Sequence, residues 1–249
     1  MGKTNDIRIF SSIEEFEQKS AEEIAHLLQA AIRDRGVCHV VLSGGDTPKG
    51  IYRRLGTDPF KHLVDWSRVH VFFSDERCVS PDDPQSNYGM VQRELTTHVG
   101  IAPSHIHRIQ TEAGAEKAAM EYEEVLRTAL GPGQRRFDVV LLGIGSDGHT
   151  ASLFPSTDAI DEDQRWVRAV YVPRLSSWRV TLTFPAINSG REVFIFASGE
   201  SKAAIVEQAL TAQAPTKEIP VTLVHPRDGL LRWRLEKQAA SKLTSLKSP

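Results

Sequence analysis

The amino-acid sequence predicts an α/β protein, in which helices cover both faces of a mostly parallel sheet. Short apolar runs typical of buried strands alternate along the chain with segments whose apolar residues recur at helical spacing. Several of the apolar runs end in glycines or charged residues, which is where open α/β sheets carry their sites. The chain has 249 residues, 40% of them hydrophobic, which suits one large domain over residues 1–249. We expect residues 241–249 to be a frayed tail.

The first two elements are predicted from capping signals as well as from periodicity. Residues 7–10 form a short strand, and Ser12 with Glu15 three positions later is typical of a capping box. A helix follows because apolar residues recur at helical spacing, and Gly36 ends it.

The rest of the chain repeats this alternation. Apolar runs predict strands over residues 37–42, 69–73, 139–142, 167–172, 180–184, 193–197 and 221–224. Helical periodicity predicts helices over residues 48–55, 87–98, 115–130, 201–210 and 230–243. Strands that alternate with helices in this way indicate βαβ units and a parallel sheet.

Composition disfavours several classes of function. A formal net charge of −2 argues against nucleic acid or a membrane surface as the main partner. No apolar stretch approaches the roughly 20 residues of a membrane span, and the N-terminus lacks the apolar core of a signal peptide. Cys38 and Cys78 are the only cysteines, which excludes a disulfide scaffold and fits a cytoplasmic enzyme.

The segment over residues 137–155 carries the strongest indication of chemistry. Its apolar run breaks into glycines and then delivers Asp147 and His149, two residues apart. Histidine can take a proton from water near neutral pH, and a nearby aspartate can fix its tautomer. The segment therefore predicts a hydrolytic or isomerising site with Asp147 and His149 as catalytic residues. The alternative is a structural turn in which His149 is merely hydrogen-bonded.

The same segment contains a literal G-x-G-x-x-G pattern over residues 143–148. A dinucleotide-binding fingerprint needs a helix directly after it, and Pro155 leaves room for only about two helical turns. Residues 161–165, where a ribose-binding acid would follow a strand, read as a polar loop. We therefore expect no nucleotide cofactor.

A second candidate site is the Gly-Gly loop over residues 43–48. Thr47 suits an N-cap and Pro48 the first helical position, so Gly44 and Gly45 can turn their N–H groups toward an anion at the helix start. Asp46 would repel a phosphate unless its carboxylate points away. The alternative is a tight strand–helix turn.

Cationic and polar side chains follow other predicted strands. Arg77 could face a developing oxyanion or a substrate carbonyl, with Asp75 beside it. Asn87 lies in a polar turn that could contact sugar hydroxyls or cap the next helix. Lys202 opens a helix against the helix dipole, which makes sense if an anion binds there, and Arg179 could share that anion. A solvated loop and surface salt bridges are the alternatives.

Other chemistries have weaker support in the sequence. His105 and His107 have the spacing of two ligands on one side of a strand, but no carboxylate or cysteine partner lies nearby, so we expect no metal. No Gly-x-Ser-x-Gly elbow is present, and no motif marks Cys78 as a nucleophile.

Taken together, five ordered segments resemble the 6-phosphogluconolactonase family. The resemblance implies a Rossmann-like, NagB-type fold without a nucleotide, a phosphorylated δ-lactone as substrate, and no metal or other cofactor. We expect a monomer or a weak homodimer. The family often has a small polar residue where this chain has Asp46, which puts the role of that side chain in doubt. The resembling segments are residues 42–48, 72–77 with 86–87, 143–155, 179–183 and 199–203, followed by residues 219–220 and Trp233.

Within that resemblance, each candidate residue takes a role. We expect His149 to be the general base on water, oriented by Asp147, and Arg77 to stabilise the oxyanion. The expected substrate- and phosphate-binding residues are Gly44, Gly45, Asp46, Asp75, Asn87, Arg179 and Lys202.

Two alternatives to a lactonase remain. Glucosamine-6-phosphate deaminases also carry Asp-Gly-His, but they have a glutamate where this chain has Phe154 and a tyrosine where it has Arg77. Loss of that second acid removes a group that ring opening and enolisation need. A sugar-phosphate sensor on the same fold is disfavoured because the chain lacks a helix-turn-helix segment and keeps Asp147 and His149.

Overall fold

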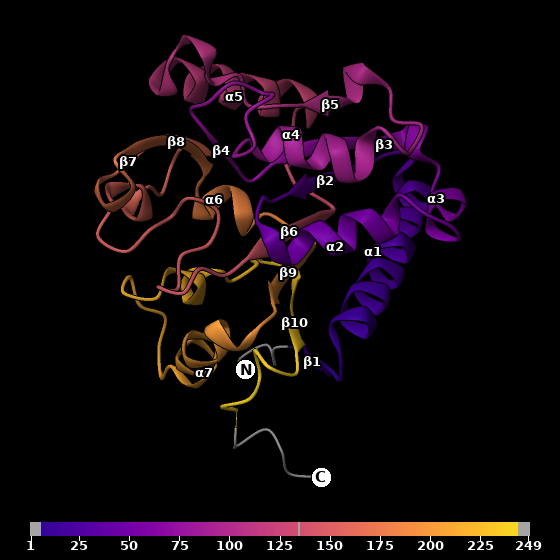
Figure 1. Ribbon diagram of the computed structural model, residues 1–249. Helices are drawn as coiled ribbons and strands as arrows, with labels where there is room; N and C mark the ends of the chain where they lie inside the picture. Colours follow the sequence, from indigo (N-terminus) through magenta and orange to yellow (C-terminus); the bar gives the residue numbers. More distant parts are fainter. Residues whose placement is uncertain (1–5, 134, 244–249) are drawn as a thin grey trace.

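The computed structural model describes residues 6–133 and 135–243 and consists of two sheets with helices around them (Figure 1). The expected tail over residues 241–249 lies outside the described residues from residue 244 onward. The larger sheet has seven strands, and every pairing within it is parallel, which confirms the predicted fold class. Its spatial order is β1 (Asp6–Phe10), β10 (Leu230–Glu236), β9 (Glu192–Ala197), β6 (Val139–Gly143), β2 (Cys38–Leu42), β3 (Val69–Phe73) and β5 (Ile106–His107).

A smaller antiparallel sheet lies beside the larger one. It consists of β4 (Asp75–Arg77), β8 (Ser177–Leu182) and β7 (Val167–Val172), and β4 follows β3 after a single residue. Ser74 links the two sheets. Its N–H donates to the carbonyl of Leu42 in β2, and its carbonyl accepts from the N–H of Leu182 in β8. The charged residues after β3 therefore form a strand rather than a solvated loop.

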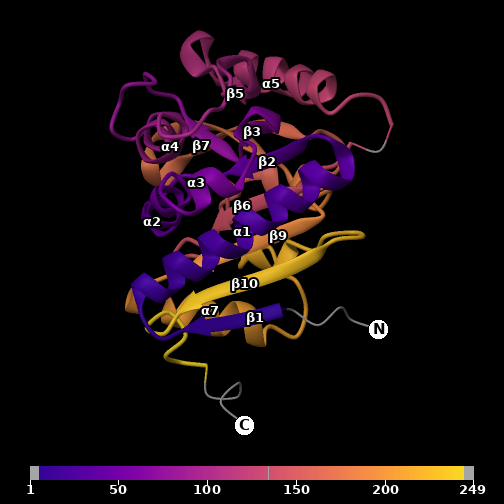
Figure 2. The same cartoon turned by 90° about the vertical axis from the view of Figure 1, so that its right-hand side faces the viewer.

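The helices follow the predicted alternation. They are α1 (Ile13–Arg35), α2 (Asp46–Leu55), α3 (Phe60–Leu63), α4 (Asn87–Val91), α5 (Ala115–Ala129), α6 (Phe184–Ile187) and α7 (Ala203–Thr211). A π-helix (Gln92–Thr96) continues α4, and 3-10 turns occupy Trp66–Arg68, Pro103–His105, Thr111–Ala113, Asp158–Asp161, Pro173–Leu175, Glu200–Lys202 and Pro220–Leu223. Figure 2 shows α1 crossing one face of the large sheet, with α2 and α3 beside it. In the residues that the structure describes, no helix has the length and apolarity needed to cross a membrane.

The capping signals around α1 are confirmed. The Ser12 hydroxyl accepts a hydrogen bond from the N–H of Glu15 at 3.2 Å, while the Glu15 carboxylate accepts from the N–H of Ser11. Gly36 ends the helix with φ of 77°, a left-handed conformation that favours glycine. These local signals are independent of tertiary context, which is why the sequence is sufficient to predict both ends of α1.

Two predicted elements are wrong. The expected strand over residues 221–224 is a 3-10 turn, in which the N–H of Val221 donates to the carbonyl of Gly148 at 2.9 Å. The expected helix over residues 230–243 is instead the strand β10, which places Trp233 and Leu235 in the core. Arg232 and Arg234 alternate along this strand and are largely buried, whereas on the outer face of a helix they would be exposed.

Burial of Arg234 explains why β10 departs from its apparent helical pattern. This side chain is fully buried, and its guanidinium donates to Glu23 of α1 at 2.6 Å and to Asp6 of β1 at 2.8 Å. A buried arginine needs such partners because an unpaired buried charge costs several kcal/mol. Both partners lie more than 200 positions away in sequence, so no local pattern could indicate them.

The order of strands creates a crevice at the centre of the large sheet. From β2 the chain crosses to β3 on one side, whereas from β6 it later reaches β9 on the other side. Adjacent parallel strands whose connections leave in opposite directions form the topological switch point at which open α/β sheets bind ligands. The loops after β2 and β6 therefore lie on either side of this crevice.

Candidate active site

A cavity of about 280 Å³ lies at this crevice, where the carboxyl ends of β2 and β6 meet β4 and the segment after β9. Most of the candidate residues line it: Gly44, Gly45, Asp46, Asp75, Arg77, Asn87, His149 and Lys202. Asp147 and Arg179 are not among the lining residues and lie beside two that are, His149 and Arg77.

His149 and Asp147 form a close pair at the end of β6. The Nδ1 atom of His149 lies 2.5 Å from Oδ1 of Asp147. A carboxylate only accepts hydrogen bonds, so Nδ1 must carry the proton, and Nε2 is the nitrogen that can accept one. A Cβ atom on Gly145 would overlap the His149 ring, so this position requires glycine.

The loop after β6 has no helix between residues 144 and 157. Gly148 has φ of 82°, and its carbonyl accepts the hydrogen bond from Val221, which fixes the turn. The G-x-G-x-x-G pattern therefore lacks the helix N-terminus that holds a pyrophosphate in a dinucleotide fold.

The surroundings of Asp147 include a cation that the sequence analysis missed. Arg174, in the turn between β7 and β8, places Nη2 2.6 Å from Oδ2 of Asp147. Burial alone would raise the pKa of Asp147, but the hydrogen bond and charge of His149, together with Arg174, lower it to about 2. Arg174 belongs to no motif and is about half exposed, so no sequence pattern indicates this contact.

The Gly-Gly loop differs in detail from its prediction. Helix α2 begins at Asp46, with Gly45 in the N-cap position at φ of 102°, so Thr47 is not the cap. The Thr47 hydroxyl instead lies 3.0 Å from that of Ser198. A Cβ on Gly44 would overlap the Asn87 side chain, and this close packing explains the need for glycine.

Asp75 and Glu76 are both buried, and their partners differ. Asp75 accepts hydrogen bonds from the hydroxyls of Ser74 and Ser152, each at 2.7 Å, and still lines the cavity. Glu76 accepts from the N–H groups of Arg77, Asn87 and Tyr88 and therefore fixes the start of α4. Burial raises the pKa of Glu76, and those N–H donors oppose the increase. Glu76 is thus structural, whereas Asp75 faces the site.

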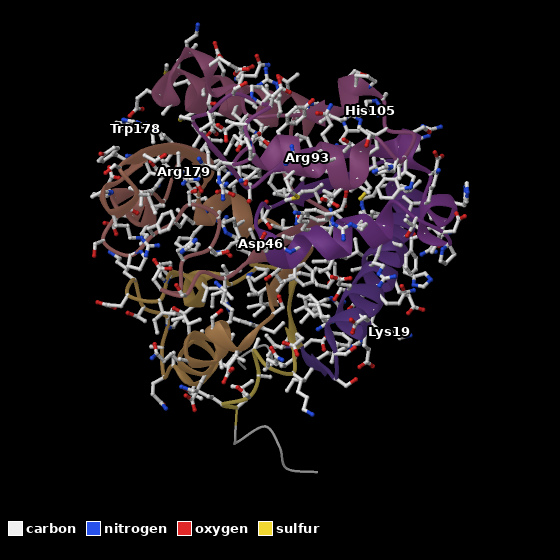
Figure 3. The ribbon with its side chains drawn as sticks, viewed as in Figure 1. Lys19, Asp46, Arg93, His105, Trp178 and Arg179 are labelled. Atoms are coloured by element: carbon white, nitrogen blue, oxygen red, sulfur yellow. The ribbon has the colours of Figure 1, made fainter. Side chains whose placement is uncertain are left out.

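Of the three candidate cations, Lys202 and Arg77 line the cavity, whereas Arg179 does not. Lys202 lines the cavity near Asp46 and Asp147, and burial lowers its pKa against the pull of those carboxylates. Arg77 also lines the cavity and donates to the carbonyl of Gln85. Arg179 pairs with Arg77 across β4 and β8, and its Nε is buried with no hydrogen-bond partner among the described residues. Figure 3 shows Arg179 on β8 and Asp46 at the start of α2.

The segment that carries Lys202 is held from the far edge of the sheet. Gly199, at φ of 83°, donates its N–H to the carboxylate of Glu236 at 3.1 Å. Glu236 is the last residue of β10 and is buried. The strand that the sequence did not predict therefore helps to position a predicted site residue.

Four other histidines gather at the opposite end of the strands. His39 and His70 are the second residues of β2 and β3, and with His105 and His107 they form a histidine cluster. His70 Nδ1 lies 3.0 Å from His107 Nε2. Burial, and then repulsion from neighbouring histidines, lowers the pKa of both His70 and His107 to about 4. No group of three or more potential ligands within the described ranges has the arrangement of a metal site.

Comparison with known proteins assigns the chain to a family. The family model described as "Glucosamine-6-phosphate isomerases/6-phosphogluconolactonase" matches residues 11–233. The "Probable 6-phosphogluconolactonase 1" of Arabidopsis thaliana is 36% identical, over 97% of this chain and 95% of that protein.

Solved structures agree with this match. A 6-phosphogluconolactonase from Trypanosoma cruzi superposes with a TM-score of 0.87 at 30% identity, covering 98% of each chain. A monomeric glucosamine-6-phosphate deaminase of the NagB superfamily has a TM-score of 0.80 at 23% identity, over 95% of this chain and 99% of that one, which shows that the fold is of the NagB type. The chain therefore belongs to the family of glucosamine-6-phosphate isomerases and 6-phosphogluconolactonases.

Proposed function

We propose that this protein is a 6-phosphogluconolactonase, which hydrolyses 6-phospho-D-glucono-1,5-lactone to 6-phospho-D-gluconate in the oxidative pentose phosphate pathway. The observation that carries the proposal is the His149–Asp147 pair at a cavity that Lys202 and Arg77 also line. A histidine in this tautomer can activate water, and the cations suit an anionic substrate. The names of the Arabidopsis and Trypanosoma relatives support the same activity.

In the proposed reaction, Nε2 of His149 takes a proton from water as the water oxygen bonds to C1 of the lactone. The carbonyl becomes a tetrahedral oxyanion, which the Arg77 guanidinium stabilises. When the carbonyl re-forms, the bond from C1 to the ring oxygen breaks, and the His149 imidazolium returns its proton to that oxygen. Asp147 keeps Nδ1 protonated throughout and thus positions His149 without touching the substrate.

The 6-phosphate would bind at the other side of the cavity, between Lys202 and the Gly44–Gly45 backbone. Lys202 carries the charge, and the start of α2 adds N–H donors. Asp46 also lines this region. Its negative charge attracts the Lys202 ammonium group, so we expect Asp46 to position Lys202 rather than to bind the phosphate. Arg179 adds positive charge from the strand next to Arg77, and its buried Nε has no hydrogen-bond partner among the described residues.

An isomerase reaction has less support at this site. It needs a further acid beside the histidine, and the position that the deaminases fill with glutamate is Phe154 here. The Phe154 ring is buried and lies 4.0 Å from the His149 ring, centroid to centroid. An apolar ring cannot transfer a proton, so hydrolysis is the reaction that these residues favour.

The test is the decay of 6-phosphogluconolactone, generated in situ, compared with its spontaneous rate. We expect the wild type to accelerate the decay and His149→Ala to lose about 10²–10⁴-fold in kcat with little change in KM. His26→Ala, an exposed histidine on α1, is the matched control and should match the wild type. A folded wild type without acceleration would exclude the lactonase activity.

Substitution of Lys202 or Arg179 tests the phosphate site separately. Lys202→Met should raise KM more than it lowers kcat, because Lys202 acts on a group that does not react. Arg179→Met should raise KM less, because Arg179 does not line the cavity and contributes its charge from beside Arg77. A normal KM in both variants would place the phosphate elsewhere.

A further inference from the structure

Arg174 lies behind the proposed base rather than in the cavity. It belongs to the 3-10 turn Pro173–Leu175 that joins β7 to β8, and its side chain is 51% exposed. Its Nη2 atom is 2.6 Å from Oδ2 of Asp147, and its Cζ atom lies 4.8 Å from the centre of the Phe154 ring. Although Arg174 is exposed, its contacts with Asp147 and Phe154 define the position of its guanidinium.

The Asp147 carboxylate is divided between two partners. Oδ1 meets Nδ1 of His149, and Oδ2 meets the guanidinium of Arg174. Phe154 makes a second link, since its ring lies 4.0 Å from the His149 ring and 4.8 Å from the Arg174 Cζ atom. Arg174 can therefore act on His149 both through charge and through packing.

The charge balance of this group decides how readily His149 takes a proton. A lone carboxylate beside an imidazole stabilises the imidazolium form, which cannot serve as a base. A guanidinium on the second oxygen offsets that charge while leaving the hydrogen bond from Nδ1 intact. In this arrangement Asp147 can orient His149 while the guanidinium offsets part of the carboxylate charge.

We propose that Arg174 is a positioning residue that keeps His149 in its neutral, proton-accepting form by sharing the Asp147 carboxylate. The proposal rests on the lactonase function, in which a neutral His149 is the base. It assigns a role in catalysis to the turn between β7 and β8, although no residue of that turn lines the cavity.

Other charged groups face His149 from the remaining elements of the site. Asp46 of α2, Asp75 and Arg77 of β4, and Lys202 before α7 all line the same cavity. They carry two negative and two positive formal charges, and substitution of Arg174 alters none of them. None of them is paired with Arg174 in the structure, so substitution of Arg174 changes one contribution at a time.

The direct test follows the His149 ring by NMR as pH is varied, in the wild type and in Arg174→Gln. The signal is assigned by its loss in His149→Ala. We expect the titration midpoint in Arg174→Gln to rise by about half to one pH unit, limited by the solvent exposure of Arg174. The acid limb of kcat/KM should move upward by the same amount, while activity above that limb is retained.

Three further variants make the result specific. Arg174→Lys keeps the charge and should stay near the wild-type midpoint. Arg168→Gln removes a cation from the same hairpin, whose partners are Glu162 and Asp158, and should change nothing. In an Asp147→Asn background, Arg174→Gln should have a smaller effect, because the shared carboxylate is gone.

The possible results separate this proposal from the lactonase assignment. An unchanged His149 midpoint in Arg174→Gln overturns the proposal, as does an equal loss of activity at every pH. A wild type that fails to accelerate lactone decay removes the lactonase function, yet the NMR titration still reports whether Arg174 acts on His149.

Discussion

His149 and the histidine cluster lie at opposite ends of the same sheet, and their surroundings give them opposite properties. His149 follows β6 and has a carboxylate on Nδ1, so one nitrogen is fixed and the other can exchange protons. His70 and His107, near the starts of β3 and β5, are hydrogen-bonded to each other, and their lowered pKa keeps them neutral. The partner and position of a histidine, rather than its presence, therefore decide its chemistry.

Among changes that retain every histidine, the largest effect should come from displacing His149. In Gly145→Ala the new methyl group would overlap the imidazole, and we expect kcat to fall by about 100-fold, because a shift of about 1 Å in a catalytic group can cost that much. Gly100→Ala is the matched control, since its new Cβ has no described heavy atom within 4 Å. Thermal unfolding of both variants checks that the fold is kept. Near-normal kcat in Gly145→Ala would show that the position of the ring does not matter.

A smaller effect should follow from removing the carboxylate partner of each histidine. Asp147→Asn should lower kcat by about 10- to 100-fold, because an amide can present the wrong group to Nδ1 and select the wrong tautomer. Asp138→Asn is its counterpart, since Asp138 accepts from the backbone N–H of His39 at 2.8 Å, lies 3.8 Å from its ring Nδ1 and pairs with Arg35.

We expect the two substitutions to change different properties: turnover for Asp147→Asn and stability for Asp138→Asn. Asp138→Asn should lower Tm and leave kcat within about twofold of the wild type, because it is remote from the site. Steady-state kinetics and thermal melts on both proteins make the distinction. A similar loss of kcat in the two variants would mean that the two ends of the sheet are not independent.

The smallest effect concerns the histidine cluster itself. With pKa values near 4, His70 and His107 stay neutral in the fold while the unfolded chain takes up protons below about pH 6.5. Their contribution to stability is thus present above pH 6.5 and is lost as the pH falls toward 4. Because these rings are partly in contact with solvent, we expect a loss of about 2–4 °C in Tm, the size that ~1 kcal/mol gives in a chain of this length.

His107→Phe measures that contribution by difference. The phenyl ring preserves the stacking on Phe72, and the variant should show a shallower fall of Tm between pH 6.5 and 4 at unchanged kcat. Parallel curves for the two proteins would contradict the assigned role of the cluster.

What the sequence could predict depended on whether the signal was local. The loops after β2 and β6 were identified as candidate sites because glycines and polar residues directly follow apolar runs. β10 was predicted as a helix, because the partners of Arg234 are brought in by α1 and β1 from the other end of the chain. Arg174 was missed for the same reason: only the folded hairpin brings it to Asp147. Arg179 was identified as a cation, but its place beside Arg77 depends on strand pairing.

The pairing of β1 with β10 also determines when the edge of the large sheet can form during synthesis. Arg234 cannot reach Glu23 or Asp6 until β10 has left the ribosome, long after α1 has emerged. Until then β1 is a strand without a neighbour, and the two acids of the N-terminal segment remain in water. A nascent chain in this state presents an unpaired strand edge, which is the kind of surface that favours aggregation and that chaperones protect. Pairing of β1 with β10 therefore makes assembly of this edge of the sheet a late event in folding.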